Sequence, residues 1–224
     1  MKKISVLFIG NSYTFCNELW NIFKEIAYSY NINVDVDNVT SGGYTLEKMN
    51  DVNDQYGFLV DCKLKNNRYD YVILQEQSLR PVIDKELFFN AVRCLNEKIR
   101  KSGATAILYE TWARKDGSDI LLKYELTSKM MSDKLIKAYS DIGKELDICV
   151  VHVGKVFYEL TTRYPEFELY DEDLSHPSLL GSYVAALTIF AAIFNVSVIG
   201  VNKRQIDNER QYILEKNIDS VIFE

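Results

Sequence analysis

The sequence predicts an α/β fold in which helices cover both faces of a parallel sheet. Two observations support this prediction. Five apolar runs of strand length alternate with stretches of helical periodicity, and this alternation is typical of parallel strands joined by crossover helices. The runs are also almost wholly apolar, as expected for strands buried on both faces. The sequence shows no linker or repeat, so we expect a single domain over residues 1–224.

The first predicted unit is a strand over residues 4–9 followed by one helix over residues 13–30. Apolar residues in the second stretch recur at intervals of three and four, which puts them on one helical face. They are Phe15, Leu19, Ile22, Phe23, Ile26, Ala27 and Tyr30. A second strand is expected over residues 32–36, where the pattern alternates. Residues 50–69 are polar and weakly patterned, and they predict only a short helix or a loop.

The middle of the chain predicts another strand–helix–strand unit. The third strand covers residues 71–74, and Asp84 is placed to cap the helix that follows and extends to Ile99. Gly103 ends that helix, because glycine is favoured just after a helix C-terminus. The fourth strand follows at residues 105–109.

The last part of the chain is predicted to be mostly helical. A long helix is expected over residues 121–146, and whether it is broken stays open. The fifth strand follows at residues 148–153 and a short helix at residues 156–162. Ser178 then begins a strongly apolar helix that extends to Phe194, and a charged final helix is expected near residues 206–221.

Composition and charge exclude several classes of partner. The chain is 47% hydrophobic and 26% charged, with a net charge of −6 and no block of lysine or arginine. We therefore expect no binding to nucleic acid, which needs clustered positive charge. The apolar run at residues 184–194 is too short to span a bilayer, so we expect no membrane insertion. The oligomeric state is not predicted.

The cysteines and the N-terminus suggest a cytoplasmic protein. Four cysteines occur at irregular spacings without a C-x-x-C pair: Cys16, Cys62, Cys94 and Cys149. We expect reduced and mostly buried thiols. The first apolar run leads directly into a helical pattern, unlike a secretory signal. The two histidines are far apart in the sequence and the cysteines are scattered, so no metal site or other cofactor is predicted.

Residues suited to chemistry follow four of the predicted strands. Ser12 comes after the first, Gly43 after the second, Gln75 and Gln77 after the third, and Trp112 after the fourth. The carboxyl ends of parallel strands meet at one edge of a sheet, which is where such folds bind ligands. Ser12 considered alone is more typical of a helix N-cap than of a nucleophile.

A late polar loop contains Asp173 and His176, three residues apart. An aspartate at this spacing can accept a hydrogen bond from one imidazole nitrogen and leave the other as a general base. Such a base would activate a serine, which is otherwise a poor nucleophile. The alternative is a solvated loop that leads into a helix cap at Ser178. The second histidine, His152, lies within a predicted strand and is expected to be a satisfied core or strand-end residue.

These residues, in this order, resemble the SGNH hydrolase superfamily of GDSL-like lipases and esterases. The resemblance covers residues 8–194. Ser12 in Gly-Asn-Ser matches the nucleophile block, Gly43 matches the oxyanion-hole glycine, and Asp173 with His176 matches the Asp-x-x-His block. The resemblance implies a flavodoxin-like three-layer α/β/α sandwich with five parallel strands in the order 2-1-3-4-5, which agrees with the fold predicted from the pattern.

Two blocks depart from the family pattern. Asn11 replaces the usual aspartate of Gly-Asp-Ser, and Gln75-Glu76-Gln77-Ser78 stands where Gly-x-Asn-Asp is usual. The sequence is therefore similar to a divergent branch, the SGNH-like carbohydrate acetylesterases with a glutamine-rich third block. Gln75 and Gln77 would share one face of a strand, so either is a candidate for the third oxyanion donor.

The resemblance implies a serine ester hydrolase that removes short acyl groups. Ser12 attacks, His176 transfers the proton, Asp173 orients His176, and the backbone N–H groups of Ser12 and Gly43 bind the oxyanion. The expected substrate is a small-molecule acyl ester, such as an acetylated sugar.

Three aromatic residues, Tyr13, Tyr44 and Trp112, are candidates for lining the substrate site, although ordinary packing explains them equally well. No role is predicted for residues 50–69 and 113–125. Two alternatives remain open: a flavodoxin-like module that binds phosphate or flavin at the first helix N-terminus, or a catalytically weak SGNH relative.

Overall fold

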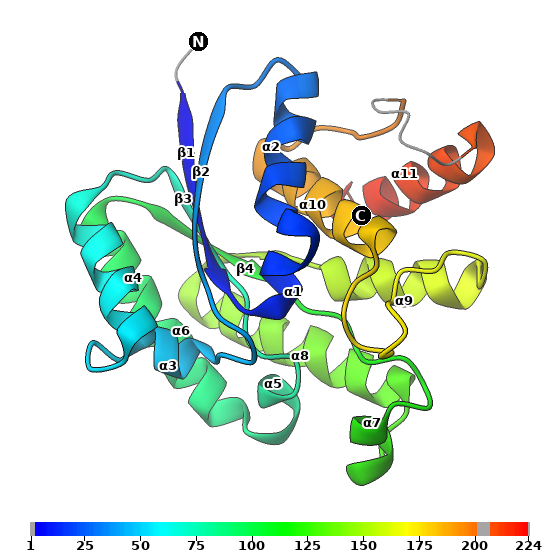
Figure 1. Cartoon of the computed structure of the whole chain (residues 1–224), viewed down its shortest axis with the longest axis horizontal. Coiled ribbons are helices and arrows are strands. Elements are labelled where there is room, and N and C mark those ends of the chain that lie inside the picture. The colour runs from blue at the N-terminus through cyan, green and yellow to red at the C-terminus, as the bar shows by residue number, and fades with distance from the viewer. Residues whose placement is uncertain (1–2, 201–206, 224) are drawn as a thin grey trace.

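The computed structural model describes residues 3–200 and 207–223, and a parallel sheet of five strands forms its centre (Figure 1). The order β2-β1-β3-β4-β5 confirms the predicted α/β fold and strand order. The strands are β1 (Ile4–Gly10), β2 (Val34–Thr40), β3 (Tyr71–Leu74), β4 (Thr105–Tyr109) and β5 (Cys149–Val151). All their carboxyl ends lie at the same edge, as parallel pairing requires.

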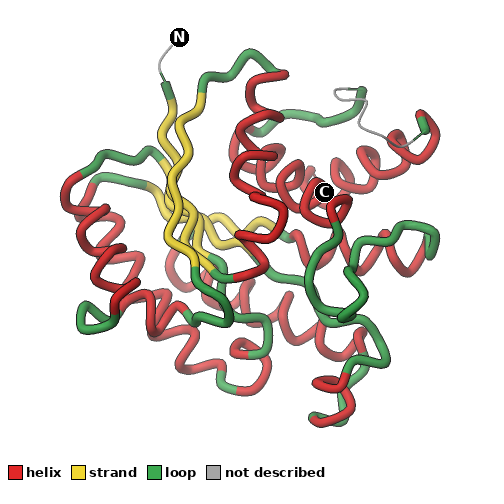
Figure 2. Tube along the Cα trace, in the orientation of Figure 1, coloured by secondary structure: helices red, strands yellow, loops and turns green. Residues whose placement is uncertain are grey.

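Helices cover both faces of this sheet and make three layers (Figure 2). In β1, Val6 and Phe8 pack on one face while Leu7 and Ile9 pack on the other, since successive strand residues point to opposite faces. The first face is covered by α2 (Leu19–Ser29), α9 (Val153–Arg163) and α10 (Leu179–Phe194), and α11 (Asn208–Phe223) packs against α9 and α10. The second is covered by α3 (Leu46–Asn50), α4 (Gln55–Asn66), α6 (Lys85–Ser102) and α8 (Ser128–Leu146).

The helix after β1 is interrupted, so the prediction of one helix over residues 13–30 is wrong. Helix α1 (Ser12–Phe15) is followed by a 3₁₀ turn (Cys16–Glu18) before α2 begins. Asn17 and Glu18 have φ angles of 55° and 51°, which an α-helix does not accommodate. The Asn17 side chain donates to the Ser182 hydroxyl at 2.9 Å and to the Pro177 carbonyl at 3.2 Å. The break therefore ties α1 to α10 and to the loop before it.

Three other segments refine the predicted boundaries. Strand β2 begins at residue 34, later than predicted, because the Ile32 N–H still bonds to the Ala27 carbonyl at the end of α2. The weakly patterned residues 50–69 contain α4. The long helical stretch is broken into α7 (Asp119–Lys123) and α8. Helix α5 (Arg80–Ile83) precedes α6, and the predicted final helix corresponds to α11, while residue 206 lies outside the described residues.

The cysteines are less buried than predicted. Cys94 and Cys149 are exposed, and Cys16 and Cys62 are half-buried, so the expectation of mostly buried thiols is wrong. Cys149 is exposed because it begins β5, an edge strand of the sheet. Within residues 3–200 and 207–223, no helix combines the length and the apolar character needed to cross a bilayer.

Candidate active site

The turn between β1 and α1 is held by the buried side chain of Asn11. Its Oδ1 accepts from the Tyr13 N–H at 3.1 Å, and its Nδ2 donates to the Tyr44 carbonyl at 2.9 Å. The Asn11 N–H donates to Gln75 Oε1 at 2.8 Å. At Gly10 an added Cβ would lie 2.5 Å from the same Gln75 oxygen, so only glycine permits this approach. These contacts place Ser12 at the first position of α1.

Ser12, His176 and Asp173 form a continuous chain of hydrogen bonds. Ser12 Oγ lies 2.8 Å from His176 Nε2, and His176 Nδ1 bonds to the Asp173 carboxylate. Asp173 also accepts from the backbone N–H groups of Ser175, at 3.0 Å, and His176, at 2.8 Å. Partial burial raises the pKa of Asp173, but these hydrogen bonds outweigh it and leave that pKa below its usual value. Asp173 is therefore ionised at neutral pH and holds the ring with Nε2 toward Ser12.

Trp112 supports the loop that contains His176. Its indole N–H donates to the Ser175 carbonyl at 3.0 Å, and its ring is stacked between Tyr13 and Phe157, with centroids 4.5 Å and 4.2 Å away. The Tyr13 hydroxyl in turn lies 2.8 Å from the Ser175 hydroxyl. Trp112 is fully buried, so it positions the loop rather than contacting a ligand.

A cleft of about 390 Å³ lies in front of Ser12, and its lining includes Gly43, Gln77, Arg114 and His176. Gly43 has φ of +68°, in the left-handed region that favours glycine. The backbone N–H groups of Ser12 and Gly43 donate to no acceptor among the residues that the structure describes. Both are therefore available to an oxygen atom of a ligand in the cleft.

The two candidate glutamines differ sharply in environment. Gln75 is buried; its oxygen accepts from Asn11 and from the Thr14 hydroxyl, and its amide nitrogen donates to the Glu76 carbonyl at 2.5 Å. Gln77 lines the cleft, and its oxygen accepts from the N–H groups of Leu79 and Arg80, at 2.9 Å and 3.0 Å. The oxygen and the amide nitrogen of Gln75 are thus both bonded inside the protein, whereas the Gln77 amide nitrogen has no acceptor within the part of the chain that the structure describes.

Glu76, for which no role was predicted, is fully buried between these loops. Its carboxyl group accepts from the N–H of Gln77 at 2.6 Å and from the N–H of Leu46, the first residue of α3, at 3.1 Å. Burial raises the pKa of Glu76 to about 8, although those two hydrogen bonds oppose the rise. Glu76 therefore ties the loop of Gly43 to the loop of Gln77. The sequence signal is a carboxylate two residues after the end of a buried strand.

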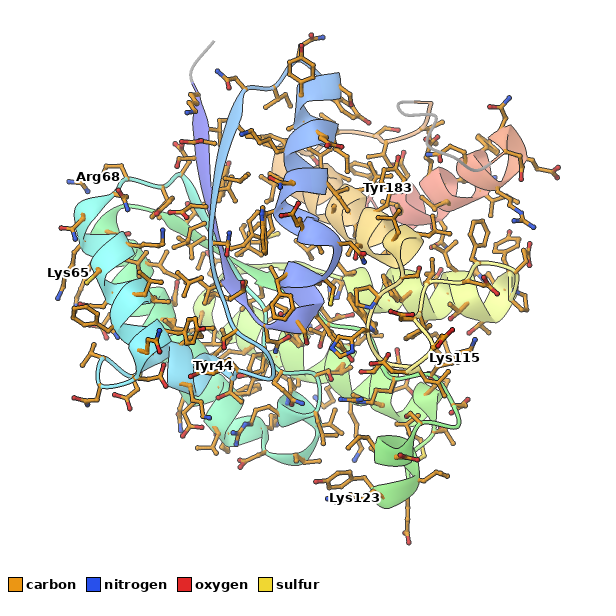
Figure 3. All side chains as sticks on the ribbon, in the orientation of Figure 1. Tyr44, Lys65, Arg68, Lys115, Lys123 and Tyr183 are labelled. Atoms are coloured by element: carbon orange, nitrogen blue, oxygen red, sulfur yellow. The ribbon has the colours of Figure 1, made fainter. Side chains whose placement is uncertain are left out.

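Of the three aromatic candidates, Tyr13 lines the cleft, while Tyr44 and Trp112 do not, contrary to the prediction. The Tyr44 hydroxyl donates to Asp54 at 3.3 Å and its ring packs against Tyr56 at 4.9 Å between centroids. Figure 3 shows Tyr44 beside α3, on the opposite side of α1 from Lys115. Tyr44 and Trp112 therefore contribute to packing around the strand ends and do not line the cleft.

Solved structures share this fold along most of the chain. A protein from Slackia heliotrinireducens assigned to the SGNH hydrolases is 26% identical, with a TM-score of 0.77, over 86% of this chain and 100% of that one. By fold and site, the chain is an SGNH-like superfamily member. The SGNH-like fold is also shared with a DUF4886 family protein from Bacteroides uniformis, which is 19% identical with a TM-score of 0.83, over 99% of this chain and 95% of that one.

An acetyl xylan esterase also has this SGNH-like fold, at 16% identity and a TM-score of 0.64, over 85% of this chain and 100% of that one. Neither a protein-family model nor a curated protein matches the sequence. The SGNH-like assignment therefore rests on structural similarity and on the residues at the sheet edge.

Proposed function

We propose that the protein is a serine ester hydrolase that removes short acyl groups from small molecules. The observation that supports this most strongly is the 2.8 Å contact between Ser12 Oγ and His176 Nε2, with Asp173 on the other ring nitrogen. The structural neighbours include an acetyl xylan esterase and an acetyl-xylooligosaccharide esterase, which supports an ester substrate. The phosphate- or flavin-binding alternative leaves this chain of hydrogen bonds unexplained.

In the proposed reaction, Ser12 Oγ attacks the ester carbonyl while His176 Nε2 takes the hydroxyl proton. The carbonyl oxygen becomes an oxyanion that accepts from the N–H groups of Ser12 and Gly43 and from the Gln77 amide. As the intermediate collapses, the alcohol leaves with the proton held by His176. Water then attacks the acyl–Ser12 ester with His176 again as base, which releases the carboxylic acid and restores the serine.

A short acyl group is proposed because the cleft is small and the ring of Phe15 limits the space next to Gly43. Phe15 is 37% exposed, and its ring edge lies 4.0 Å from where a Cβ at Gly42 would stand. Phe15 and Gly42 both line the cleft next to Gly43. An acetyl group bound with its oxygen at Gly43 would meet this ring. We therefore propose an acetylated carbohydrate or a similar small acetyl ester as substrate.

The test is hydrolysis of a small acetate ester by the wild type and by Ser12→Ala. We expect turnover to fall by at least about 10⁴-fold, because the nucleophile is lost. Ser102→Ala is a matched control, since Ser102 ends α6 and its hydroxyl only donates to the Ile99 carbonyl. A fluorophosphonate probe should label the wild type and not the Ser12 variant. Equal rates in the two proteins, or no labelling, would overturn the proposal.

A further inference from the structure

Arg114 lines the cleft of Ser12 and His176, yet its guanidinium group has no partner among residues 3–200 and 207–223. Its Nε is buried without a hydrogen-bond acceptor, and the guanidinium forms no ion pair with any residue that the structure describes. Other arginines do pair with carboxylates: Arg80, Arg93, Arg163 and Arg210. A buried donor without an acceptor is costly, which suggests that a ligand supplies the acceptor.

Two acidic residues near this segment are already engaged. Asp173 bonds to the His176 ring, and Asp116 accepts from the Ser128 N–H at 2.7 Å. The positive charge of Arg114 also acts on the site itself. Burial raises the pKa of the Tyr13 hydroxyl, and Arg114 partly offsets that rise. Arg114 is thus close to Tyr13, which lies between Ser12 and the His176 loop. The positive charge of Arg114 has no carboxylate partner among the described residues.

Arg114 belongs to the His176 side of the cleft. The N–H of the next residue, Lys115, donates to the Leu174 carbonyl at 2.9 Å. Figure 3 shows Lys115 beside the loop that precedes α10, far from Tyr44, the neighbour of Gly43. The candidate oxyanion donors Gly43 and Gln77 follow β2 and β3, whereas Arg114 follows β4. Arg114 therefore lies on the His176 side of the cleft, away from the loop of Gly43.

This placement identifies which half of an ester it faces. His176 must return a proton to the leaving oxygen, so the alcohol half lies next to His176. We propose that Arg114 binds an anionic group, a carboxylate or a phosphate, on the alcohol half of the ester. An arginine presents paired N–H donors that match either group. This inference rests on the proposed ester hydrolase function and names its substrate class: acyl esters of acidic alcohols.

Matched acetate esters test the inference: 4-acetoxybenzoate and 4-acetoxyphenyl phosphate carry an anion on the alcohol half, and 4-acetoxybenzamide is neutral. The readout is kcat/KM for each anionic ester relative to the neutral one. We expect this ratio to fall by about 10- to 100-fold in Arg114→Gln. Arg114→Lys should fall between the two, because it keeps the charge and loses the paired donors. Of the two anionic esters, the one with the larger ratio in the wild type shows whether the site prefers a carboxylate or a phosphate.

Arg100→Gln is the control, because Arg100 is exposed on α6 and outside this cleft, and it should leave every ratio unchanged. Identical ratios in the wild type and in both Arg114 variants would overturn the inference. The inference would also be overturned if Arg114→Gln lowered kcat/KM only for 4-nitrophenyl succinate, which carries its carboxylate on the acyl half. Melting temperatures identify an Arg114→Gln protein that fails to fold, in which case Arg114→Lys decides.

Failure of the proposed function is distinguishable, because then no ester is hydrolysed in a Ser12-dependent way. Calorimetric binding of 4-acetoxybenzoate to Ser12→Ala, with and without Arg114→Gln, still tests the anion site in that case. Binding that weakens by about 10-fold or more in the double variant supports the site. Equal binding, or no binding to either protein, overturns it.

Discussion

Two histidine–carboxylate pairs lie at the same edge of the sheet, and only one faces a nucleophile. His176 bonds through Nδ1 to Asp173, and His152 bonds through Nδ1 to Glu110 at 2.5 Å. His176 Nε2 reaches Ser12, whereas His152 Nε2 has no hydrogen-bond partner among the described residues. The Asp173 side chain is 49% exposed and the Glu110 side chain is 0% exposed.

The second pair instead builds the junction of β4, β5 and α9. Glu110 Oε1 accepts from the Lys155 N–H at 3.0 Å, and the Glu110 carbonyl accepts from the Gly154 N–H at 3.1 Å. A Cβ at Gly154 would lie 2.3 Å from the Thr111 carbonyl oxygen, so the backbones are in close contact. Glu110 thus satisfies N–H groups in the first turn of α9 that have no partner within the helix. A histidine–carboxylate pair indicates catalysis only where a nucleophile meets the free nitrogen.

Replacing each histidine by alanine should separate the two pairs most widely. His176→Ala is expected to lower kcat for an acetate ester by about 10⁴- to 10⁶-fold, since Ser12 loses its base, with little change in stability. His152→Ala is expected to leave kcat within a few-fold and to lower the free energy of unfolding by about 1–3 kcal/mol, because Glu110 loses a buried partner. Ester kinetics and urea denaturation of both variants measure these effects.

The contrast would be broken if His152→Ala lost as much activity as His176→Ala while it stayed folded. His152 would then belong to the reaction. Near-UV circular dichroism of each variant guards against scoring a misfolded protein as inactive.

Much of the fold was predictable because it depends on local periodicity. The apolar runs predicted the five strands, and the alternation predicted their parallel pairing. The break after α1 was not predictable, because Asn17 and Glu18 leave the helical region where the Asn17 side chain bonds to Ser182 and Pro177. Those partners lie more than 150 residues away in sequence, and no local pattern reports them.

The site was predictable in its order and less so in its details. Ser12, Asp173 and His176 were predicted from their places along the chain, and the structure brings them into hydrogen-bond contact. Trp112 was proposed to line the site, but its side chain turns into the core, which strand-end position alone does not specify. Arg114 had no sequence signal, because a single arginine in a charged loop resembles any solvated residue.

The two glutamines offer a second contrast, because Gln77 lines the cleft and Gln75 is buried. Gln77→Glu keeps the side-chain oxygen that accepts from Leu79 and Arg80 but removes the amide donor. We expect kcat to fall by about 10²- to 10³-fold, the usual cost of one oxyanion donor. Gln75→Ala is expected to lower the free energy of unfolding by about 1–3 kcal/mol instead, because Asn11 and Thr14 lose their acceptor. An unchanged kcat in Gln77→Glu would remove Gln77 from the oxyanion hole.

The smallest expected effect is the opposite pH dependence of the two carboxylates. The pKa of Asp173 lies below its usual value, so its contribution to stability is present above about pH 4 and is lost as the pH falls. Burial raises the pKa of Glu110, although His152 and Lys155 oppose the rise. The folded protein therefore holds that proton more tightly than the unfolded chain, and stability is lost as the pH rises above about 4.5.

Urea denaturation of Asp173→Asn and Glu110→Gln between about pH 3 and pH 8 measures both trends against the wild type. Glu110→Gln should gain stability relative to the wild type as the pH rises above about 4.5, by at most about 1.4 kcal/mol per pH unit. Asp173→Asn should be less stable than the wild type at neutral pH, and this difference should shrink as the pH falls below about 4. The change should be smaller than for Glu110→Gln, because water screens the exposed carboxylate. If the stability difference from the wild type changed with pH in the same direction for both variants, burial would not distinguish the two pairs.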